Sequence, residues 1–523
     1  MRKLIAKTAT DFPAATVVFL IALPLCLGIA LGSNAPLFSG IIAGIIGGIV
    51  VGIFSGSSLS VSGPAAGLTA VVAMAIGKLP AFEAFLLAVT MAGIFQIIFG
   101  FLKAGVIGDY VPNAVIRGML AAIGIILILK QLPHLVGYDK DFSGDEAFIQ
   151  IDQQNTFSEL IYAINYLSPA SLLIGFISVI VLLAWERPFI KKSPWAKYFP
   201  GPLLVVILGT AINELLVHQG SRFIVEKNHL VNLPVANSYH DFVQFFSHPK
   251  WEYISNPRVW TIAITIALVA SLETLLGIEA VDKLDSFNRR TPANRELKAQ
   301  GLGNLISGLL GGLPVTSVIV RSAANVEAGA QSKMSTISHG FLLLLSVIFF
   351  PGLINKVPLS ALAAILVITG YKLAKPSLFL ELHRKGLDQL IPFIATILAI
   401  LFSDLLTGIL IGVGVSLFFL VRSNFKSSVV IVSNDKSWLV RFRKDVSFLN
   451  KPIVKDGLDS VPDGSYVLID LTRADFIDKD IVDVINEFMH RAPLKMIRID
   501  IKKSNYKSAH QHFLEPQSIN VID

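Results

Sequence analysis

Charged residues are scarce in this chain of 523 residues, because Asp, Glu, Lys and Arg together make up only 15% of it. A soluble globular domain carries about 25% charged residues. Hydrophobic residues reach 53%, the mean hydropathy is +0.66, and long uncharged runs recur, such as Thr16 to Leu31. In lipid, a helix of about 20 apolar residues can span the bilayer and satisfy its own backbone hydrogen bonds. The composition therefore excludes an ordinary soluble domain and predicts a helical integral membrane protein.

Cysteine is almost absent, and an excess of acidic residues is lacking. Cys26 is the only cysteine, so no disulfide can form within the chain, and its place in the first apolar segment favours a packing role. The net charge is +7. In a soluble protein this sign could indicate a nucleic-acid partner, but here the basic residues lie in short loops between apolar segments. We expect them to orient the spans in the lipid bilayer, and we expect no nucleic-acid partner.

The apolar pattern predicts about fourteen membrane segments, seven in each half of the chain. The halves cover about residues 14–216 and 259–421. The third and tenth segments are too short to cross the bilayer as helices. The segments run near Ala14–Leu31, Leu37–Phe54, Ala65–Ile76, Phe82–Leu102, Asn113–Leu132, Pro169–Trp185 and Pro202–Leu216, and then near Val259–Ile278, Ala299–Leu313, Val320–Ala330, Ile337–Ile354, Leu359–Leu373, Leu390–Phe402 and Leu406–Val421.

The loops between these segments alternate in charge. Loops around Lys191, Arg289 and Arg384 are basic, whereas the loop between Leu132 and Pro169 is acidic. Lys and Arg mark the cytoplasmic side of a membrane protein. We therefore expect a multi-pass protein of the plasma (inner) membrane with both termini in the cytoplasm.

An odd number of segments in each half inserts the two halves with opposite orientation. The short segments occupy the third place in both halves, and each follows a stretch broken by Gly and Pro, at 60–64 and 311–317. Gly and Pro are tolerated as kinks in membrane helices, which is one interpretation. Interrupted helices at matching positions of two inverted repeats are, however, typical of a transporter binding site. Finding two of them in register favours the binding site.

Half-helices that start at Ala65 and near Val320 would direct their N-terminal N–H groups toward each other at mid-membrane. A helix N-terminus carries about half a positive charge and free donors, so this arrangement suits an anion. Arg321 lies beside the second start, where an unpaired charge is costly. It either adds positive field to an anion site or forms a structural ion pair.

Glu273 is the acidic residue expected to matter most, because it lies in the otherwise apolar eighth segment between Ser271 and Thr274. It could carry a coupling proton, ligate a sodium ion or only neutralise Arg321. Hydroxyl groups also lie near the crossing point, but in membrane helices such groups more often bond their own backbone than a ligand. They belong to Ser62, Thr69, Thr316 and Ser317.

The chain changes character after Arg422. Charged residues mix with short apolar runs, which predicts a small soluble α/β domain. We expect strands at 438–442, 466–471 and 496–501 and an amphipathic helix at 481–491. The predicted division is a transmembrane domain over residues 1–428 and a cytoplasmic domain over 429–523.

Several motifs together resemble the sulfate permease (SulP) family, related to solute carrier group 26, over nearly the whole chain. The resemblance implies seven-plus-seven inverted repeats, a core domain that moves against a gate domain, a cytoplasmic STAS domain and often a homodimer. Family members carry sulfate, bicarbonate, chloride, oxalate or dicarboxylates. The motifs are Leu23-Pro24, Ser62-Gly63-Pro64, Pro292-Ala293-Asn294-Arg295-Glu296-Leu297 with Gln300-Gly301 and Asn304, and Gly312-Leu313-Pro314 leading to Arg321-Ser322.

Carried over by motif, the resemblance implies a substrate site formed by the first, third, eighth and tenth segments, with Glu273 in coupling. Sodium-coupled bicarbonate members have a hydroxyl residue two positions before the arginine, where this chain has Ile319, although Thr69 is kept. Proton coupling and anion exchange therefore stay open. The implied site residues are Leu25, Ile29, Ala65, Ala66, Gly67, Thr69, Glu273, Val318, Ile319, Val320 and Arg321.

The subgroup that this chain resembles includes relatives encoded with or fused to carbonic anhydrases, which favours bicarbonate and a functional link to carbonic anhydrase. In the tail, Phe476-Ile477 is followed by Asp478-Lys479-Asp480, without the serine that STAS domains often carry there. Phosphorylation at that point is not expected, and a role in folding or dimer contacts is as plausible as regulation.

Together these features predict a secondary active transporter of small inorganic anions that works by alternating access. Two alternatives stay open: a passive anion channel or uniporter on the same scaffold, and an anion-sensing membrane protein. An enzyme is not expected, because no metal-ligand cluster or nucleophile–base pair appears among the segments. No metal ion or cofactor is predicted.

Overall fold

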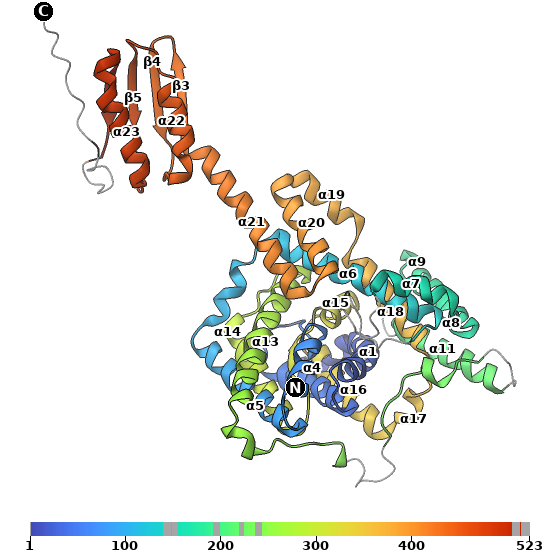
Figure 1. The fold of residues 1–523 in the computed structure, drawn as a ribbon. Helices are drawn as coiled ribbons and strands as arrows, with labels where there is room; N and C mark the ends of the chain where they lie inside the picture. Colours follow the sequence, from blue (N-terminus) through green and yellow to red (C-terminus); the bar gives the residue numbers. More distant parts are fainter. Residues whose placement is uncertain are drawn as a thin grey trace, which may run out of the picture. The chain divides into compact units, whose positions relative to one another are not determined.

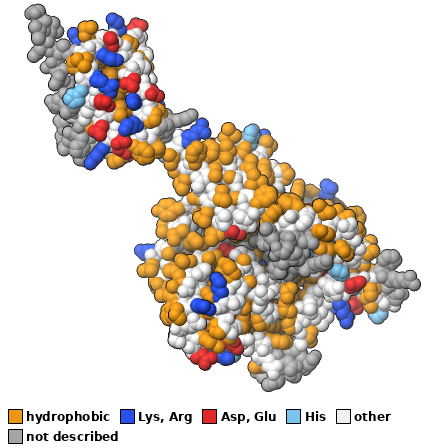
Figure 2. All heavy atoms as spheres, viewed as in Figure 1, with side chains coloured by type: hydrophobic (Ala, Val, Ile, Leu, Met, Phe, Trp, Pro, Cys, Tyr) orange, Lys and Arg blue, Asp and Glu red, His pale blue; other side chains and the backbone are white. Residues whose placement is uncertain are grey.

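The computed structural model describes residues 2–139, 148, 155–191, 199–218, 224–235, 243–504 and 513. The chain divides into two compact units, Met1–Val413 and Gly414–Asp523. Figure 1 shows that the first unit is built from helices, whereas the second contains a sheet. On the face seen in Figure 2, hydrophobic side chains cover much of the first unit and charged side chains are frequent on the second. This contrast is what contact with lipid and with water, respectively, requires.

Each of the fourteen predicted segments corresponds to a helix, and the helices at 156–165, 188–191 and 376–385 were not predicted. The first half contains α1 (Arg2–Gly32), α2 (Leu37–Ile46), which continues through η1 (Gly47–Val51) and α3 (Gly52–Phe54), α4 (Thr69–Lys78), α5 (Phe82–Phe101), α6 (Asn113–Val136), α7 (Thr156–Asn165), α8 (Pro169–Trp185), α9 (Pro188–Lys191) and α11 (Gly201–His218). The second half contains α13 (Pro257–Leu284), α14 (Ala293–Leu310), α15 (Ile319–Glu327), α16 (Met334–Phe349), α17 (Pro351–Ile354), α18 (Leu359–Leu373), α19 (Pro376–Lys385), α20 (Leu387–Phe402) and α21 (Leu405–Ser428).

Within the described residues, 8 helices are long and apolar enough to cross a membrane, or 9 if the bent pair α7 and α8 counts as one span. The prediction that the third and tenth segments are short is confirmed, since α4 has 10 residues and α15 has 9. At about 1.5 Å per residue, each covers about half of the hydrocarbon thickness.

The two halves repeat one packing scheme. Helix α1 packs on α16 of the other half, and its counterpart α13 packs on α5, which is the counterpart of α16. Helix α6 packs on its own counterpart α18, and the two strands that precede α4 and α15 pair with each other. Such reciprocal contacts between equivalent elements are what two inverted repeats with opposite orientation predict.

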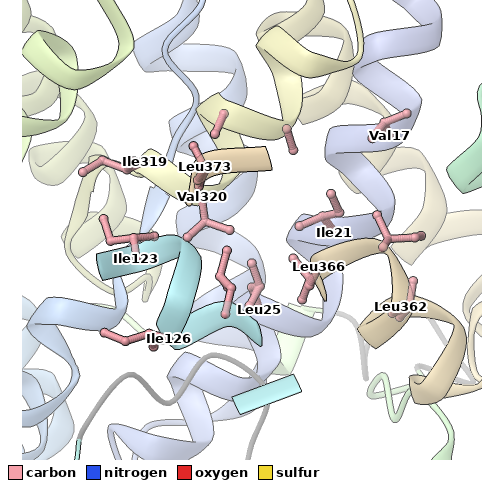
Figure 3. Close-up of a cluster of buried hydrophobic side chains, with 14 of the residues drawn as sticks. Val17, Ile21, Leu25, Ile123, Ile126, Ile319, Val320, Leu362, Leu366 and Leu373 are labelled. Carbon is pink, nitrogen blue, oxygen red and sulfur yellow. The ribbon is translucent and has the colours of Figure 1, made fainter. Parts of the chain in front are cut away.

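An apolar seam runs between two groups of helices. On one side are α1 and α15, and on the other are α6 and α18. Figure 3 shows buried aliphatic side chains that these helices contribute to one cluster. The seam is built from Val17, Ile21 and Leu25 of α1, Ile319 and Val320 of α15, Ile123 and Ile126 of α6, and Leu362, Leu366 and Leu373 of α18.

The second unit contains a four-stranded sheet in the order β3-β4-β5-β6. Strands β3 and β4 are antiparallel, and the other neighbours are parallel. The predicted strands and helix correspond to β4 (Ser437–Phe442), β5 (Tyr466–Asp470), β6 (Arg498–Lys502) and α23 (Lys479–Arg491). The sequence analysis missed β3 (Val429–Asn434) and α22 (Lys451–Asp459). Three residues of β3 are exposed, and α22 contains Pro452 and Gly457, so neither has a clear local signal.

A loop between α11 and α13, residues 224–235, is tied to the helices around it. Asn213 Oδ1 accepts a hydrogen bond from the Val225 N–H at 3.1 Å. At the middle of the loop, His229 places Nδ1 against one carboxylate oxygen of Asp139. His134, in the last turn of α6, places its Nδ1 against the other oxygen. Asp139 borders a cavity of about 200 Å³ that the loop covers together with the ends of α1, α2 and α18. The loop therefore forms one wall of this cavity beside the end of α1.

We expect this clasp to depend on pH. Burial alone would raise the pKa of Asp139, but hydrogen bonds from His134 and His229 outweigh burial and lower it, and the bond to Asp139 raises the pKa of His229. The carboxylate stabilises the clasp above about pH 4 and loses this effect as the pH falls through its lowered pKa. His229 stabilises it below about pH 6.5 and loses this effect as the pH rises through its raised pKa.

Amide hydrogen exchange of residues 224–235, corrected for the intrinsic exchange rate, should therefore be slowest between about pH 4 and pH 6.5. It should become faster at alkaline pH. In His229→Asn the alkaline increase should become smaller, because Asn does not titrate and only His134 still lies against Asp139. An identical pH profile in wild type and variant would contradict the clasp.

Candidate functional site

Two buried three-residue strands lie at the centre of the first unit. Strand β1 (Ser62–Pro64) pairs antiparallel with β2 (Val315–Ser317), with Gly63 opposite Thr316. After β1 the chain enters a 3₁₀ turn, η2 (Ala66–Leu68), and then α4; after β2 it enters α15 through Val318. The breaks predicted at 60–64 and 311–317 are therefore strands, which the sequence analysis did not foresee. Both short helices begin beside this strand pair.

One face of α14 holds the strand pair in place through a ladder of polar side chains that are all 0% exposed. Asn304 donates to the Val315 carbonyl at 2.9 Å and accepts from the Val315 N–H at 2.5 Å. Gln300 donates to Ser62 Oγ at 2.6 Å, and Glu296 accepts from Ser55 Oγ at 2.5 Å. Buried backbone groups in a dry interior need such partners. The ladder consists of Glu296, Gln300, Asn304 and Ser307, spaced four, four and three residues apart.

The two halves are also joined through hydroxyl groups. Ser60 Oγ and Ser317 Oγ are 2.6 Å apart, and Ser322 Oγ accepts from the Val61 N–H at 2.9 Å. Ser62 and Ser317 thus bond protein partners, whereas Thr316 Oγ1 has no hydrogen-bond partner among the described residues. The structure assigns the first two hydroxyls to the scaffold.

A nearly closed cavity of about 20 Å³ lies where the short helices begin. A space of this size holds about one water molecule. Six of the predicted site residues line it: Leu25, Ile29, Ala66, Val318, Val320 and Arg321. The opposite wall, from α6, was missed and consists of Ile126, Leu127, Lys130 and Gln131. A lysine inside an apolar segment is a signal that could have found this wall.

Glu273 lines a different cavity, of about 30 Å³, together with Gly67 and with Asp404, Leu405 and other residues of the α20–α21 region. A Cβ atom built on Gly67 would lie 2.1 Å from Glu273 Oε1, so the carboxylate occupies the space that any other side chain would need. The carboxylate therefore lies against the 3₁₀ turn that opens α4. The remaining predicted residues Ala65, Thr69 and Ile319 line neither cavity within the part of the chain that the structure describes.

Arg321 is 0% exposed, and none of its three side-chain nitrogens has a hydrogen-bond partner among the described residues. Its guanidinium lies against Gly63, where a Cβ atom would lie 2.2 Å from Nη1. The structural alternative, a hydrogen-bonded pair of Arg321 with Glu273, is thus not formed in the described part of the molecule. The positive charge stays beside the N-terminus of α15.

A helical membrane unit built from two halves, with a broken helix of each half meeting at its centre, is an arrangement typical of membrane transporters. The family model of the sulfate permease family matches residues 9–427. The chain belongs to the sulfate permease family of anion transporters. The predicted all-α polytopic fold and the resemblance are thereby confirmed.

Individual relatives agree with this assignment. The bicarbonate transporter BicA of Picosynechococcus sp. is 26% identical over 427 residues, which cover 79% of this chain and 71% of BicA. The sodium-independent sulfate anion transporter of Bos taurus is 25% identical over 484 residues, covering 86% and 77%. The solved structure of SLC26A9 aligns with a TM-score of 0.65 at 15% identity over 96% of this chain and 86% of that chain. That structural likeness shows the fold, and the relatives' names support the prediction that the chain is not an enzyme.

The ladder on α14 generates a stability prediction. Asn304→Leu leaves the N–H and C=O of Val315 and the Gln96 Oε1 without their partner, at about 1–3 kcal/mol for each buried group. Ser307→Ala loses only one bond, to the Leu313 carbonyl. We expect Asn304→Leu to lower the melting temperature of the detergent-solubilised protein severely and Ser307→Ala to lower it slightly. Equal melting temperatures would show that the strand pair does not depend on α14.

Proposed function

We propose that the chain is a secondary active transporter of small inorganic anions, of the sulfate or bicarbonate class, and that it works by alternating access. One observation carries the proposal: η2 and α15 begin against the same small cavity, with Arg321 at the second start. Unpaired N–H groups at helix starts bind an anion without a metal ion or cofactor. The substrate would lie among Leu25, Ile29, Ala66, Val318, Val320 and Arg321.

The apolar seam supports movement. Helices α1 and α15 carry one wall of the cavity, and α6 carries the other. Contacts between aliphatic side chains are non-directional, so this surface can slide without breaking hydrogen bonds. The strand pair and α14 would move as one rigid body, because their contacts are directional. A partly exposed ion pair of Lys372 on α18 with Glu327 at the end of α15, 3.3 Å long, would have to open during that movement.

Glu273 supplies a physical reason for coupling. Its carboxylate lies against the 3₁₀ turn that precedes α4, so it is a negative charge close to the place where the anion would bind. Like charges disfavour each other, and protonation of Glu273 removes the repulsion. We therefore infer that anion and proton move together, or that anions exchange. Sodium coupling has less support, because Ile319 has no hydroxyl that could ligate a sodium ion.

The substrate is placed in the class of small inorganic anions. Relatives named for bicarbonate and for sulfate match this chain almost equally well. Within this class, the motif resemblance favours bicarbonate and a functional link to carbonic anhydrase. A passive uniporter on the same scaffold would show uptake that does not concentrate the anion.

Two variants test the coupling role. Glu273→Gln keeps the volume but cannot ionise. Gly67→Ala forces the carboxylate away from the α4 start by occupying its space. In proteoliposomes with an imposed proton gradient, Glu273→Gln should abolish concentrative uptake of bicarbonate or sulfate, while exchange survives. Gly67→Ala should reduce concentrative uptake but retain its dependence on the gradient.

The melting temperature separates coupling from structure. If Glu273 is only structural, Glu273→Gln should lower the melting temperature and leave gradient-driven uptake per folded molecule unchanged. That pair of results would refute the coupling role. Thr265→Ala on the exposed face of α13 serves as the control, because this hydroxyl bonds only the Thr261 carbonyl of its own helix. It should behave like wild type in both measurements.

For the second unit we propose a STAS-like cytoplasmic domain over residues 429–523 attached to a transport domain over residues 1–428. Its own buried core, around Val440, Ile469 and Ile485, can stabilise it without the helical unit. Deleting residues 429–523 should therefore leave the transport domain folded, with a monodisperse elution profile and measurable uptake. Loss of all folded protein would show that the tail is structurally required, for example through contacts within a homodimer.

A further inference from the structure

The second unit brings its own piece of apolar helix, because residues 414–428 of α21 belong to it. The stretch of α21 that is apolar enough to cross a membrane ends at Arg422, and β3 begins directly after Ser428 (Figure 1). At about 1.5 Å per residue, β3 starts about 9 Å beyond that stretch, and the headgroup region of a bilayer is about 5–8 Å thick. The start of β3 therefore lies close to the lipid headgroups. Four large apolar side chains of this part of α21 are 46–61% exposed, as contact with lipid requires: Leu417, Phe418, Leu420 and Val421.

The edge of the sheet at which β3 begins also holds the ends of the other three strands. Strand β4 is antiparallel to β3, and just after its end the Arg443 N–H donates to the Ser428 carbonyl at 2.8 Å. Strands β5 and β6 run parallel to β4, so they end at the same edge. We call the segments that follow these ends, residues 443–451, 472–480 and 502–503, the helix-proximal edge. It lies at the same end of the sheet as the lipid-facing helix.

Two phenylalanines are exposed on the helix-proximal edge. Phe448 is 57% exposed and Phe476 is 56% exposed, and Leu449 adds an apolar side chain that is 40% exposed. The two loops are bonded to each other, since the Val446 N–H donates to the Phe476 carbonyl at 3.1 Å. The Phe448 N–H donates to Asp478 Oδ2, also at 3.1 Å. These bonds hold both loops in place with large apolar side chains in the solvent, which is typical of an interaction site.

The charge of this edge suits a lipid surface. Its three segments contain seven basic and four acidic residues. Two of the acidic side chains have partners within the edge: Asp445 Oδ1 accepts from the Phe476 N–H at 2.9 Å, and Asp480 lies 3.4 Å from Lys451 Nζ. Basic side chains near a membrane are attracted to anionic headgroups. The edge therefore combines apolar anchors with an excess of positive charge.

The opposite edge of the sheet shows that exposure alone does not select a membrane-binding surface. Leu494 is 86% exposed and Met496 is 73% exposed, and both precede the start of β6. A strand of five residues is about 16 Å long, so these side chains lie about that much farther from α21. They offer apolar area without access to the bilayer.

We propose that the helix-proximal edge docks on the lipid bilayer, with Phe448, Leu449 and Phe476 among the headgroups and the basic side chains against anionic lipids. Surfaces that join apolar side chains to Lys and Arg bind membrane interfaces in this way. The bilayer is the occupant that the chain itself indicates, because the lipid-facing helix leads into this edge. The docking goes beyond the proposed transport function and does not depend on the anion that is carried.

A fluorescent label on a single cysteine tests the docking in the full chain. Cys26→Ala removes the native thiol, and bimane is attached through Lys479→Cys at the helix-proximal edge or Leu494→Cys at the opposite edge; both sites are exposed. The protein is placed in phosphatidylcholine nanodiscs, with or without phosphatidylglycerol, that contain a lipid with a spin-labelled headgroup. Such a lipid quenches bimane on contact. The label at position 479 should be quenched, more strongly with phosphatidylglycerol, and the label at 494 should not.

Variants made in the protein labelled at position 479 separate the two contributions. Phe448→Ser with Phe476→Ser should reduce quenching in both lipids, because the anchors are lost. Lys444→Gln should lower the ratio of docked to undocked molecules about fivefold, which corresponds to about 1 kcal/mol, and only with phosphatidylglycerol. Met496→Ser at the opposite edge is the matched control and should change nothing. All these side chains are exposed, so the variants should fold, which a monodisperse elution profile checks.

Equal quenching at positions 479 and 494, or none at 479, would overturn the docking. A label at 479 with blue-shifted emission but no quenching by lipid would assign the edge to a protein surface, such as a second copy of the chain, and would overturn it too. Unchanged quenching in the double phenylalanine variant would refute the anchors. None of these measurements involves transport, so a chain that docks but carries no anion would contradict only the proposed function.

Discussion

The structure depends on one constraint: the backbone of two broken helices has to be hydrogen bonded where no water or lipid can supply a partner. Strands β1 and β2 meet it by pairing with each other, and the amide of Asn304 satisfies the groups of Val315 that remain. Because one strand comes from each half of the chain, the same bonds hold the two repeats together. Both short helices take their starting points from this crossing.

This constraint explains which buried polar side chains form hydrogen bonds with the protein and which do not. Glu296, Gln300 and Asn304 are fully buried, and their hydrogen bonds join α14 to the strand pair and to each other. They nevertheless belong to motifs that carry the family resemblance. Arg321 is equally buried, but its nitrogens bond nothing in the described protein. The unit therefore combines a hydrogen-bonded polar centre with one buried charge that has no hydrogen-bond partner among the described residues.

Hydrogen bonds and aliphatic contacts occur in different parts of the helical unit, which suggests which parts move together. Directional hydrogen bonds join α14 to the strand pair. The seam of α1 and α15 against α6 and α18 is built from aliphatic side chains (Figure 3), with the ion pair of Lys372 and Glu327 across it. The loop over residues 224–235 and its Asp139 clasp lie beside the end of α1. A body that is rigid on one side and smooth on the other is suited to the rocking movement that alternating access requires.

The sequence by itself determined the membrane class and the two short helices, because long apolar runs and their lengths are local properties. Arg321 and the breaks at 60–64 and 311–317 stood out against an apolar background, and the motif resemblance pointed to the other five predicted residues that line the cavity. The tertiary structure decided the rest. Glu273 lies apart from Arg321, and Lys130 of α6 joins the cavity, because the depth and rotation of packed helices place them. The strand pairing of Gly63 with Thr316 joins residues more than two hundred positions apart, and no local pattern records such a bond.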